Sequence, residues 1–465
     1  MRLDSVQYNT IMVNFLLAGL PSCIFLFIKT AFMGIRFSDT NVYFYTAMEL
    51  LKGKLLYKDI FFTNLPLFPY ISSLYTLLIG KKLEMYYLTA SIEVIITGVL
   101  MFFLVLKKTQ NRLYAVATQC IYLFSFIILS TSDHQTGVFM ASMFSIIAYF
   151  FYTKKMDIPG GIFLALMVLT KAYYISIVVA FFIYLIFKEK RRLIRFLLGF
   201  ITTCIIVLLP FFIFAGRELT QDVIFYSLFR SQGINKLTLV QFFISHDLLL
   251  SLLLSFSLFL PNKNPLFFFI MLLSMLLLIL YKDVYYLYLN ILIPYIVLSF
   301  SDLIIQYCEK IKKYWQFIFP LAGIFLVINI TTYFNQYATL QKLDESKEMA
   351  KIIKKENPEY LYGTMEVTPA LAYLTGIHLL DNIIDTNDNL FYKGVLNTQT
   401  LTRRLFSKKT ILAAKGMNYP SSNVYKPVSG PVIDEETVMK RCKKIFDSPI
   451  KTEGAINNIT LFKCY

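Results

Sequence analysis

The chain has few of the residues that build metal or redox sites. It contains six cysteines and three histidines in 465 residues. No CxxC pair occurs, and His134, His246 and His378 have no histidine or cysteine neighbour at zinc-ligand spacing. The sequence therefore argues against a structural zinc site. Cys442 and Cys464 alone share the C-terminal region, where they could pair in an oxidising compartment or stay as two thiols.

Charged residues are also scarce. They make up 16% of the chain, against 57% hydrophobic and 17% aromatic residues, and the mean hydropathy is +0.60. A soluble surface needs more charge than this, so the composition predicts a polytopic membrane protein. The net charge is +16, and most of the excess lies before about Tyr333, where 27 basic and 15 acidic residues occur among apolar segments. Such lysines and arginines hold cytoplasmic loops and anionic head groups, so we expect no nucleic-acid partner.

About eleven segments are apolar enough to cross a membrane, for which roughly 20 residues are needed. They cover residues 11–33, 84–106, 113–131, 136–152, the short pair 159–170 and 172–187, 194–215, 239–260, 265–281, 284–306 and 315–333. The first lacks a small-residue cleavage site and is therefore expected to be a signal anchor. The pattern predicts an all-α polytopic membrane fold.

Basic clusters set the orientation of these segments. They lie at residues 107–112, 154–155, 188–195, 262–264 and 309–313. With Arg2 they place 15 positive residues in alternating short loops, whereas the opposite loops hold 11. Because positive residues favour the cytoplasmic side, we expect a cytoplasmic N-terminus and, after an odd number of spans, an extracytoplasmic C-terminal region.

The first external loop is long and rich in aromatic residues. Residues 65–80 are short for a span and open with two prolines, so we expect them to lie along the outer membrane interface. Residues 40–52 carry Val42, Phe44 and Met48 at near-helical spacing and predict a second, amphipathic interfacial helix.

The composition changes near residue 335, where a charged helical pattern is followed by a short strand-like run and a helix start at Thr368-Pro369. We therefore predict two domains, a membrane domain over residues 1–333 and a small extracytoplasmic α/β domain over 334–465. Asn329 and Asn458 each begin an N-glycosylation sequon, and we expect Asn458 to lie outside.

Asp39 directly follows the first predicted span, in "FSDTNVYFYTA" at a predicted helix start. Two readings fit it. Ser38 or Asp39 could cap the helix by accepting backbone N–H bonds. Alternatively, Asp39 could serve at the membrane surface as a general base that removes a proton from an acceptor hydroxyl or amine. The two readings are compatible.

The order of several segments resembles the GT-C membrane glycosyltransferases. The segments are "SDTNVYFYTAMELLKGKLLYKD", the proline-bearing "TNLPLFPYI", a span ending in "LVLKK", the loop "STSDHQTG" and "GGIFLALMVLTKAYYISIVVAFFIYLIFKEK". Within that fold the chain is most similar to the protein O-mannosyltransferase and lipid A aminoarabinose transferase branch. The resemblance covers about residues 11–305 as a pattern.

The resemblance implies roles for individual residues. Asp39 matches the acid of the family's first external loop, its catalytic base, although Thr40 follows where the family often has a second acid. Asp59, Tyr57 and the stretch that begins at Asn64 match the region that lines the donor or acceptor groove.

Charged residues further along the chain leave alternatives open. Lys171 in "LTKAYY" matches a Thr-Lys pair of the family and could hold a lipid-linked phosphate, or it could reach to the interface. Asp133 with His134 could hold a divalent cation, or they could form a hairpin turn. Arg230, in a long external loop, could contact phosphate or be solvated. Glu93 and Asp247 lie inside apparent spans, and we assign them no role.

The implied activity is transfer of a sugar at the outer face of the membrane. The donor would be a dolichyl- or undecaprenyl-phosphate sugar, and the acceptor a glycolipid, a polysaccharide or a protein, with Asp39 as base in an inverting displacement. The oligosaccharyltransferase signature Trp-Trp-Asp-Tyr-Gly is absent, because the chain has one tryptophan. A transporter, a flippase or a non-catalytic scaffold for glycan assembly is the alternative, although no internal repeat is evident.

Overall fold

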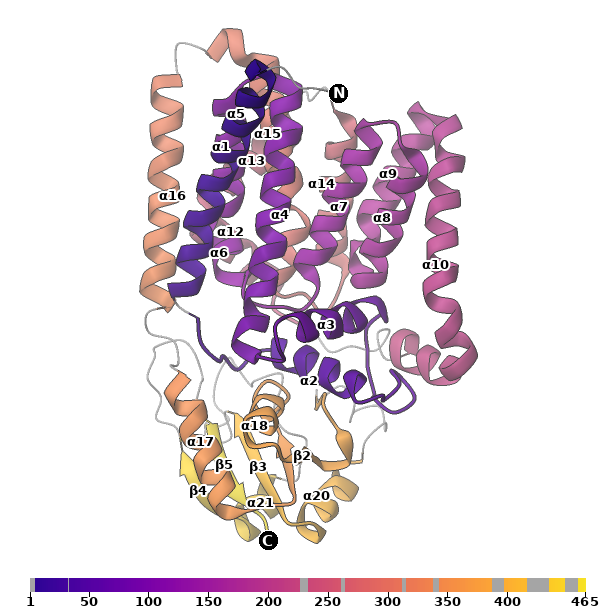
Figure 1. Ribbon diagram of the computed structural model, residues 1–465, viewed down its shortest axis with the longest axis vertical. Coiled ribbons are helices and arrows are strands. Elements are labelled where there is room, and N and C mark those ends of the chain that lie inside the picture. The colour runs from indigo at the N-terminus through magenta and orange to yellow at the C-terminus, as the bar shows by residue number, and fades with distance from the viewer. Residues whose placement is uncertain are drawn as a thin grey trace. The chain divides into compact units, whose positions relative to one another are not determined.

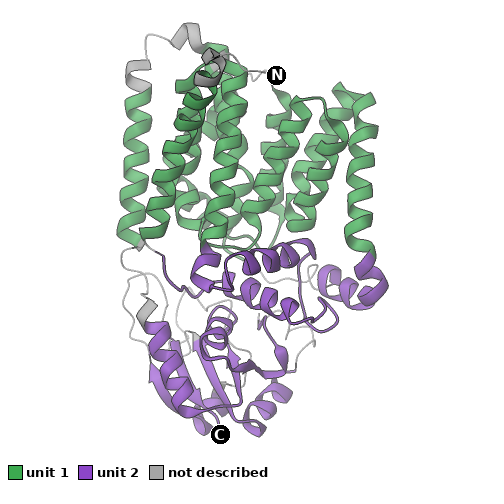
Figure 2. Ribbon diagram, in the orientation of Figure 1, with its two compact units in different colours: residues 1–32, 88–209, 232–336 green, residues 33–87, 210–231, 337–465 purple. Residues whose placement is uncertain are grey.

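The computed structural model describes residues 5–31, 33–225, 233–260, 264–311, 315–337, 343–386, 397–415, 435–447 and 459–465. The chain forms two compact units, shown in Figure 2. We call residues 1–32, 88–209 and 232–336 the helical unit, and residues 33–87, 210–231 and 337–465 the sheet unit. The predicted division at residues 333/334 stays a prediction.

The helical unit consists of helices in the part of the chain that the structure describes (Figure 1). They are α1 (Ser5–Ala31), α4 (Leu83–Thr109), α5 (Arg112–Leu123), α6 (Phe126–Thr131), α7 (Val138–Thr153), α8 (Asp157–Thr170), η1 (Ala172–Tyr174), α9 (Ile175–Lys188), α10 (Lys190–Leu219), α12 (Lys236–His246), α13 (Leu248–Phe259), α14 (Pro265–Leu280), η3 (Tyr286–Ile291), α15 (Ile293–Ile311) and α16 (Trp315–Tyr337). Helices α4 and α10 continue into the sheet unit.

Four of the described helical segments are long and apolar enough to cross a membrane, or five if one bent pair counts as a span. The four are Thr10–Ala31, Leu83–Thr109, Lys190–Phe225 and Tyr286–Ile304. Five further apolar helices are shorter, at 10–17 residues. The protein is thus a largely helical membrane protein, and the count of eleven spans stays a prediction.

The predicted span over residues 239–260 is bent in the structure, because α12 and α13 meet at an angle of 107°, and its place in the count of spans stays a prediction. The chain leaves the helical conformation at Asp247, whose buried carboxylate accepts hydrogen bonds from the Ile127 backbone N–H at 3.2 Å and the Asn329 amide at 3.3 Å. The acid is therefore satisfied by a polar network, as buried acids in spans usually are. Asn329 is buried within α16, so its sequon does not mark a surface loop.

Helices α8 and α10 pack closely against each other at two glycines, one in each helix. A Cβ atom at Gly161 would lie 2.1 Å from the Phe196 carbonyl oxygen, and one at Gly199 would lie 2.3 Å from the Ile158 carbonyl oxygen. Any larger residue at either position would push the helices apart. Small residues at such contacts allow the close backbone approach on which helix pairing in membranes depends.

The sheet unit contains both helices and strands. Its elements are α2 (Thr40–Leu51), α3 (Leu67–Leu78), the π-helix η2 (Thr220–Phe225), α17 (Leu343–Glu356), β1 (Tyr360–Gly363), α18 (Thr368–Thr375), β2 (His378–Leu379), η5 (Leu380–Asn382), α20 (Thr398–Ser407), β3 (Thr410–Lys415), α21 (Glu435–Arg441), β4 (Lys443–Asp447) and β5 (Ile459–Lys463). The predicted small α/β region and the helix start at Thr368 are confirmed.

The five strands form one mixed sheet in the order β2-β1-β3-β5-β4. β1 pairs in parallel with β2 and β3, whereas β5 pairs antiparallel with β3 and β4. β1 ends at Gly363, which has a φ of 148° and lies against Ala413 so closely that a Cβ atom would sit 1.9 Å from its carbonyl oxygen. Only glycine fits there.

A disulfide joins Cys442, directly before β4, to Cys464, just after β5. Of the two alternatives open in the sequence, pairing is therefore correct. Cys464 belongs to the buried core of the sheet, together with Tyr362, Leu412 and Phe462. The disulfide thus links the end of the edge strand β4 to the buried core of the sheet.

Reduction of this disulfide should destabilise the sheet unit by about 3 kcal/mol, because the bond closes a 22-residue loop. We expect the Cys442→Ser variant and reductant-treated wild-type protein to unfold at the same, lowered temperature in detergent. Cys204→Ser, which changes a free cysteine, is the matched control and should unfold like the wild type. Equal unfolding of Cys442→Ser and wild-type protein would contradict the prediction.

The two helices of the first external loop differ in exposure. In α2, nine of 12 residues are buried, and α2 packs against α3 and α18, so it differs from the predicted interfacial helix with one lipid-facing side. In α3, an apolar stripe is exposed while the hydroxyl-bearing residues Ser72, Ser73 and Thr76 are buried. The stripe consists of Tyr70, Leu74, Leu77 and Leu78, which are 40–74% exposed. This inverted pattern is typical of a helix that contacts lipid.

Glu49 of α2 forms ion pairs with Lys52 and Lys54. Burial raises its pKa, but the two lysines outweigh this and hold the pKa of Glu49 below its usual value. A lowered pKa contributes stability that is present above the unfolded-state value of about 4.3 and is lost as pH falls through the folded-state value.

We therefore expect Glu49→Gln to lower the free energy of unfolding of the sheet unit at pH 7 by about 1–2 kcal/mol, a modest loss because the lysine ends are partly solvated. The difference from wild type should shrink below about pH 4, measured by thermal unfolding across pH. Glu348→Gln, at an exposed position of α17, should have no effect at either pH. A pH-independent loss would mean that packing, not charge, is responsible.

Candidate active site

Asp39 lies at the N-terminus of α2 and is exposed. Its backbone carbonyl accepts the first hydrogen bond of the helix from Val42 N–H at 3.0 Å. Its side chain makes no capping hydrogen bond to α2. Capping of α2 by the Asp39 side chain, one of the readings of the sequence, is therefore not observed.

The turn that carries Asp39 is held by a buried network. The Asn41 amide donates to the backbone carbonyls of Arg36, at 2.8 Å, and Glu366, at 2.6 Å. The Tyr87 hydroxyl donates to the Arg36 carbonyl at 2.6 Å and lies 2.5 Å from the Asn41 side-chain oxygen. Asn41 and Tyr87 are both buried, so the segment on either side of Asp39 is fixed.

The loop after α2 contains the other predicted residues of the sheet unit. Tyr57 is buried and donates a hydrogen bond to the Asn64 carbonyl at 2.7 Å, and the Asn64 amide lies 3.4 Å from the Tyr43 hydroxyl. Tyr43 is four residues, or one helical turn, after Asp39. The loop thus returns Asn64 to the first half of α2. Asp59 is exposed and accepts the backbone N–H of Leu55 at 2.8 Å, which closes a turn.

Tyr57 adopts the left-handed conformation, with a φ of 68°, which is uncommon for a residue with a bulky side chain. Its ring packs edge-on against Phe211 at 5.8 Å between centroids. Burial raises the pKa of the Tyr57 hydroxyl above its usual value, and the nearby Asp222 carboxylate raises it further. The hydroxyl therefore stays protonated and acts as a hydrogen-bond donor in the loop.

Lys171 lies at the break between α8 and α9, as the sequence predicts. Its backbone is extended and its side chain is buried. The break is fixed by Tyr174, whose hydroxyl donates to the Val138 carbonyl at 3.0 Å and pairs with Ser142 at 2.6 Å. Val138 opens α7 directly after the loop that carries Asp133 and His134, so the structure brings Lys171 to the same region of the helical unit.

The loop of residues 131–137 is largely buried, and two of its residues form hydrogen bonds with α4. The Gln135 amide donates to Thr89 at 2.8 Å and Glu93 at 2.9 Å. The Ser91 hydroxyl donates to the Ser132 carbonyl at 2.9 Å. Glu93, an acid inside a span without an assigned role, therefore belongs to a network that positions this loop.

The cation beside Asp133 is Lys29, a residue that sequence reasoning missed. Its amine lies 3.7 Å from the Asp133 carboxylate, donates to the Leu129 carbonyl at 2.8 Å and to the Tyr333 hydroxyl at 3.1 Å. Lys29 is only 3% exposed although it lies in the first span. A single charged lysine inside an apolar span costs free energy unless it has a partner. Its position in the first span was therefore the signal in the sequence that Lys29 has a polar or acidic partner.

The predicted divalent-cation site at Asp133 and His134 stays a prediction. His134 and Asp133 lie 3.8 Å apart, but no group of three or more metal-ligating side chains occurs among the residues that the structure describes. A lysine amine already faces the Asp133 carboxylate, and it would repel a second cation there. Arg230, the remaining predicted phosphate contact, lies outside the described residues.

Two kinds of sequence comparison identify no relative. No protein-family model matches the chain, and no curated protein does so either.

The fold, in contrast, has known counterparts. The chain is similar to ArnT from Cupriavidus metallidurans bound to undecaprenyl phosphate, with a TM-score of 0.65 over 98% of each chain and 10% sequence identity. It is also similar to the apo form of that ArnT, with a TM-score of 0.60, 10% identity, and coverage of 95% of this chain and 97% of the other. The predicted GT-C fold with its appended sheet is therefore confirmed along nearly the whole chain.

Proposed function

We propose that the protein is an integral-membrane glycosyltransferase that uses a sugar linked to polyprenyl phosphate. The similarity to an ArnT structure with bound undecaprenyl phosphate carries the proposal, because it extends over 98% of both chains. A shared fold alone does not fix an activity. Support from the chain itself is the exposed carboxylate of Asp39 on a rigidly held turn, as expected of a general base.

In the proposed reaction, the acceptor hydroxyl or amine attacks the anomeric carbon of the sugar. Asp39 takes the proton of the attacking group, a bond forms between the acceptor and the anomeric carbon, and the bond from that carbon to the phosphate oxygen breaks. Polyprenyl phosphate leaves, and a single displacement inverts the anomeric centre. Lys171 would stabilise the charge of the leaving phosphate, and Arg230 would assist. Tyr57, Asp59 and Asn64 would line the groove.

No step of this mechanism needs a metal ion. The contacts of Asp133 with Lys29 favour a structural role for this acid, so we assign it no part in substrate binding. An assay run with EDTA and with added Mg²⁺ tests this assignment, and we expect equal rates under both conditions.

The disulfide supports an extracytoplasmic location for the C-terminal part of the chain, because disulfides persist in oxidising compartments. This agrees with the orientation expected from the basic clusters. A sugar donor that reaches this side must arrive within the membrane, since nucleotide sugars are cytoplasmic. We therefore propose a membrane-linked donor and an acceptor that is a glycolipid, a polysaccharide or a protein.

The test is release of polyprenyl phosphate from short-chain polyprenyl-phosphate sugars by the purified protein in detergent, with a membrane fraction as the source of acceptor. We expect release that depends on both donor and acceptor. If well-folded protein releases no polyprenyl phosphate from any donor, the proposal fails, and a transporter, flippase or scaffold would be favoured instead.

A further inference from the structure

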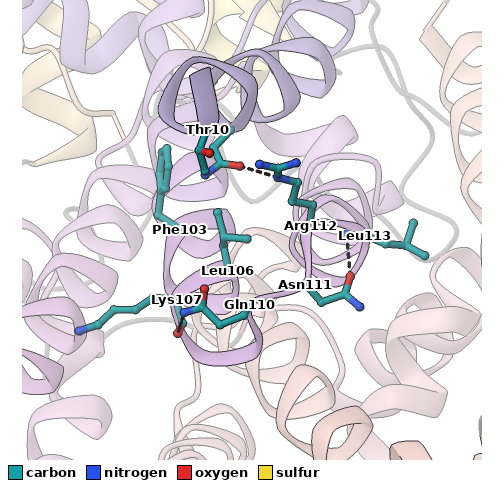
Figure 3. Close-up of a pocket in the computed structure, with 9 residues that line it drawn as sticks. Thr10, Phe103, Leu106, Lys107, Gln110, Asn111, Arg112 and Leu113 are labelled. Carbon is teal, nitrogen blue, oxygen red and sulfur yellow. Dashed lines mark hydrogen bonds between the residues drawn. The ribbon is translucent and has the colours of Figure 1, made fainter. Parts of the chain in front are cut away.

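A pocket of about 650 Å³ opens at the turn between α4 and α5 (Figure 3). The residues that line it come from α1, from the end of α4 and from the start of α5: Thr10, Asn14, Phe103, Leu106, Lys107, Gln110, Asn111, Arg112 and Leu113. Its volume is in the range of pockets that bind small molecules. It lies wholly within the helical unit.

The pocket is lined by two positively charged residues and by no acidic residue. The two are Lys107 and Arg112. Neither residue forms an ion pair with a carboxylate in the described part of the chain, although the adjacent Lys108 is paired with Asp302. The charges of this pocket are thus available to an anionic ligand.

Two arginines at the same end of the helical unit, where α10 begins, are neutralised within the chain (Figure 1). Arg192 and Arg195 at the start of α10 both bind the buried Asp157 at 2.7 Å.

The orientation of the Arg112 side chain is fixed by a hydrogen bond. The Arg112 Nε donates to the Asn14 side-chain oxygen at 2.9 Å, which orients the guanidinium at the pocket wall. No described residue takes up its two terminal amino groups. The turn itself is rigid, because Asn111 caps α5 by accepting the backbone N–H of Leu113 at 2.9 Å, and Gln110 donates to the Lys107 carbonyl at 3.0 Å. A planar guanidinium fixed in this way suits a phosphate group.

The surroundings of the pocket are apolar. Phe103, Leu106 and Leu113 form part of its lining, and Leu113 is 57% exposed. Phe103 packs against Phe15 of α1, which is 60% exposed on one of the membrane-crossing helices. A ligand in this position would meet two cations and, beside them, a lipid-facing surface.

We propose that this pocket binds the head group of an anionic phospholipid. The phosphate would bind Lys107 and Arg112, and the acyl chains would lie along the exposed apolar side chains of α1 and α5. A soluble phosphate would satisfy the charges but not the apolar flank. The site is distinct in residues and chemistry from the proposed transferase site and does not depend on that activity.

The experiment is native mass spectrometry of the full-length protein in detergent, titrated with phosphatidylglycerol or with phosphatidylcholine that carries the same acyl chains. We expect one phosphatidylglycerol to bind at low concentration and no comparable binding of phosphatidylcholine. The variant Lys107→Gln/Arg112→Gln should bind phosphatidylglycerol about 25-fold more weakly, since each charge contributes about a factor of five. Lys155→Gln removes an exposed charge at the α7–α8 turn and should leave binding unchanged.

Equal binding of the two lipids, or full binding by the double variant, would overturn the proposal. So would competition by sn-glycerol 3-phosphate at the same concentration as the lipid, because the site would then serve a soluble phosphate. If the double variant does not fold, Lys107→Gln alone decides the question, since it leaves the bond from Arg112 to Asn14 intact. It should weaken binding about fivefold, and unchanged binding would overturn the proposal.

Discussion

Asp39→Asn is expected to lower the rate of sugar transfer by about 10²- to 10⁴-fold, the usual contribution of a general base. The substitution keeps the size and shape of the side chain, but it replaces one acceptor oxygen by an NH2 donor and removes the ability to take a proton. Because Asp39 is exposed and makes no capping bond, the amide should not disturb α2. We therefore expect unchanged folding and unchanged donor binding, with the loss confined to the chemical step.

The measurement is initial-rate release of polyprenyl phosphate by wild type and variant side by side, together with thermal unfolding of each. Glu359→Gln, at an exposed position before β1, is the matched control and should retain full activity. A variant with wild-type rate and product would exclude Asp39 as the base. A loss of activity accompanied by a loss of folding would instead assign Asp39 a structural role.

Lys29→Met is expected to destabilise the helical unit by about 3–5 kcal/mol, the usual effect of removing one partner from a buried ion pair. The Asp133 carboxylate would lose its lysine in a site where both side chains are nearly inaccessible to water. The Leu129 carbonyl and the Tyr333 hydroxyl would lose a donor at the same time. We expect a strongly lowered unfolding temperature in detergent.

The double variant Lys29→Met/Asp133→Leu tests whether the ion pair between Lys29 and Asp133 serves stability alone or also serves activity. Replacing both partners by apolar residues should restore most of the lost stability, because no buried charge is then left without its counterion. If Asp133 is structural, the restored protein should also regain transfer activity. A stable but inactive double variant would show that Asp133 acts on the substrate, contrary to our assignment.

The sequence predicted those features that depend on neighbouring residues. The break at Lys171 was predictable because a charge interrupts an apolar run, and the start of α18 because Thr368-Pro369 is a typical helix beginning. The bend at Asp247 was not predictable from the sequence. Hydropathy is averaged over a window, and one acid among many leucines changes the mean hydropathy of that window only slightly. The acid instead bonds to Ile127 and Asn329, which are far away along the chain.

Long-range contacts also explain what was missed at the candidate site. Lys29 and Asp133 are about 100 residues apart in the sequence, and nothing local links them. The apolar stripe of α2 looked like a membrane-facing side because its partners, α3 and α18, could not be inferred from the pattern of α2 itself. An amphipathic pattern predicts a buried side, but it does not say whether lipid or protein covers it.

The bond from the Asn41 amide to the Glu366 carbonyl limits how the protein can be divided or recombined. It joins the segment beside Asp39 to a part of the chain more than 300 residues later, within a single compact unit. A truncated enzyme that ends near residue 333 would keep Asp39 but lose the support of its turn. In the same way, a chimaera that exchanges the C-terminal region between homologues would have to exchange residues 33–87 with it.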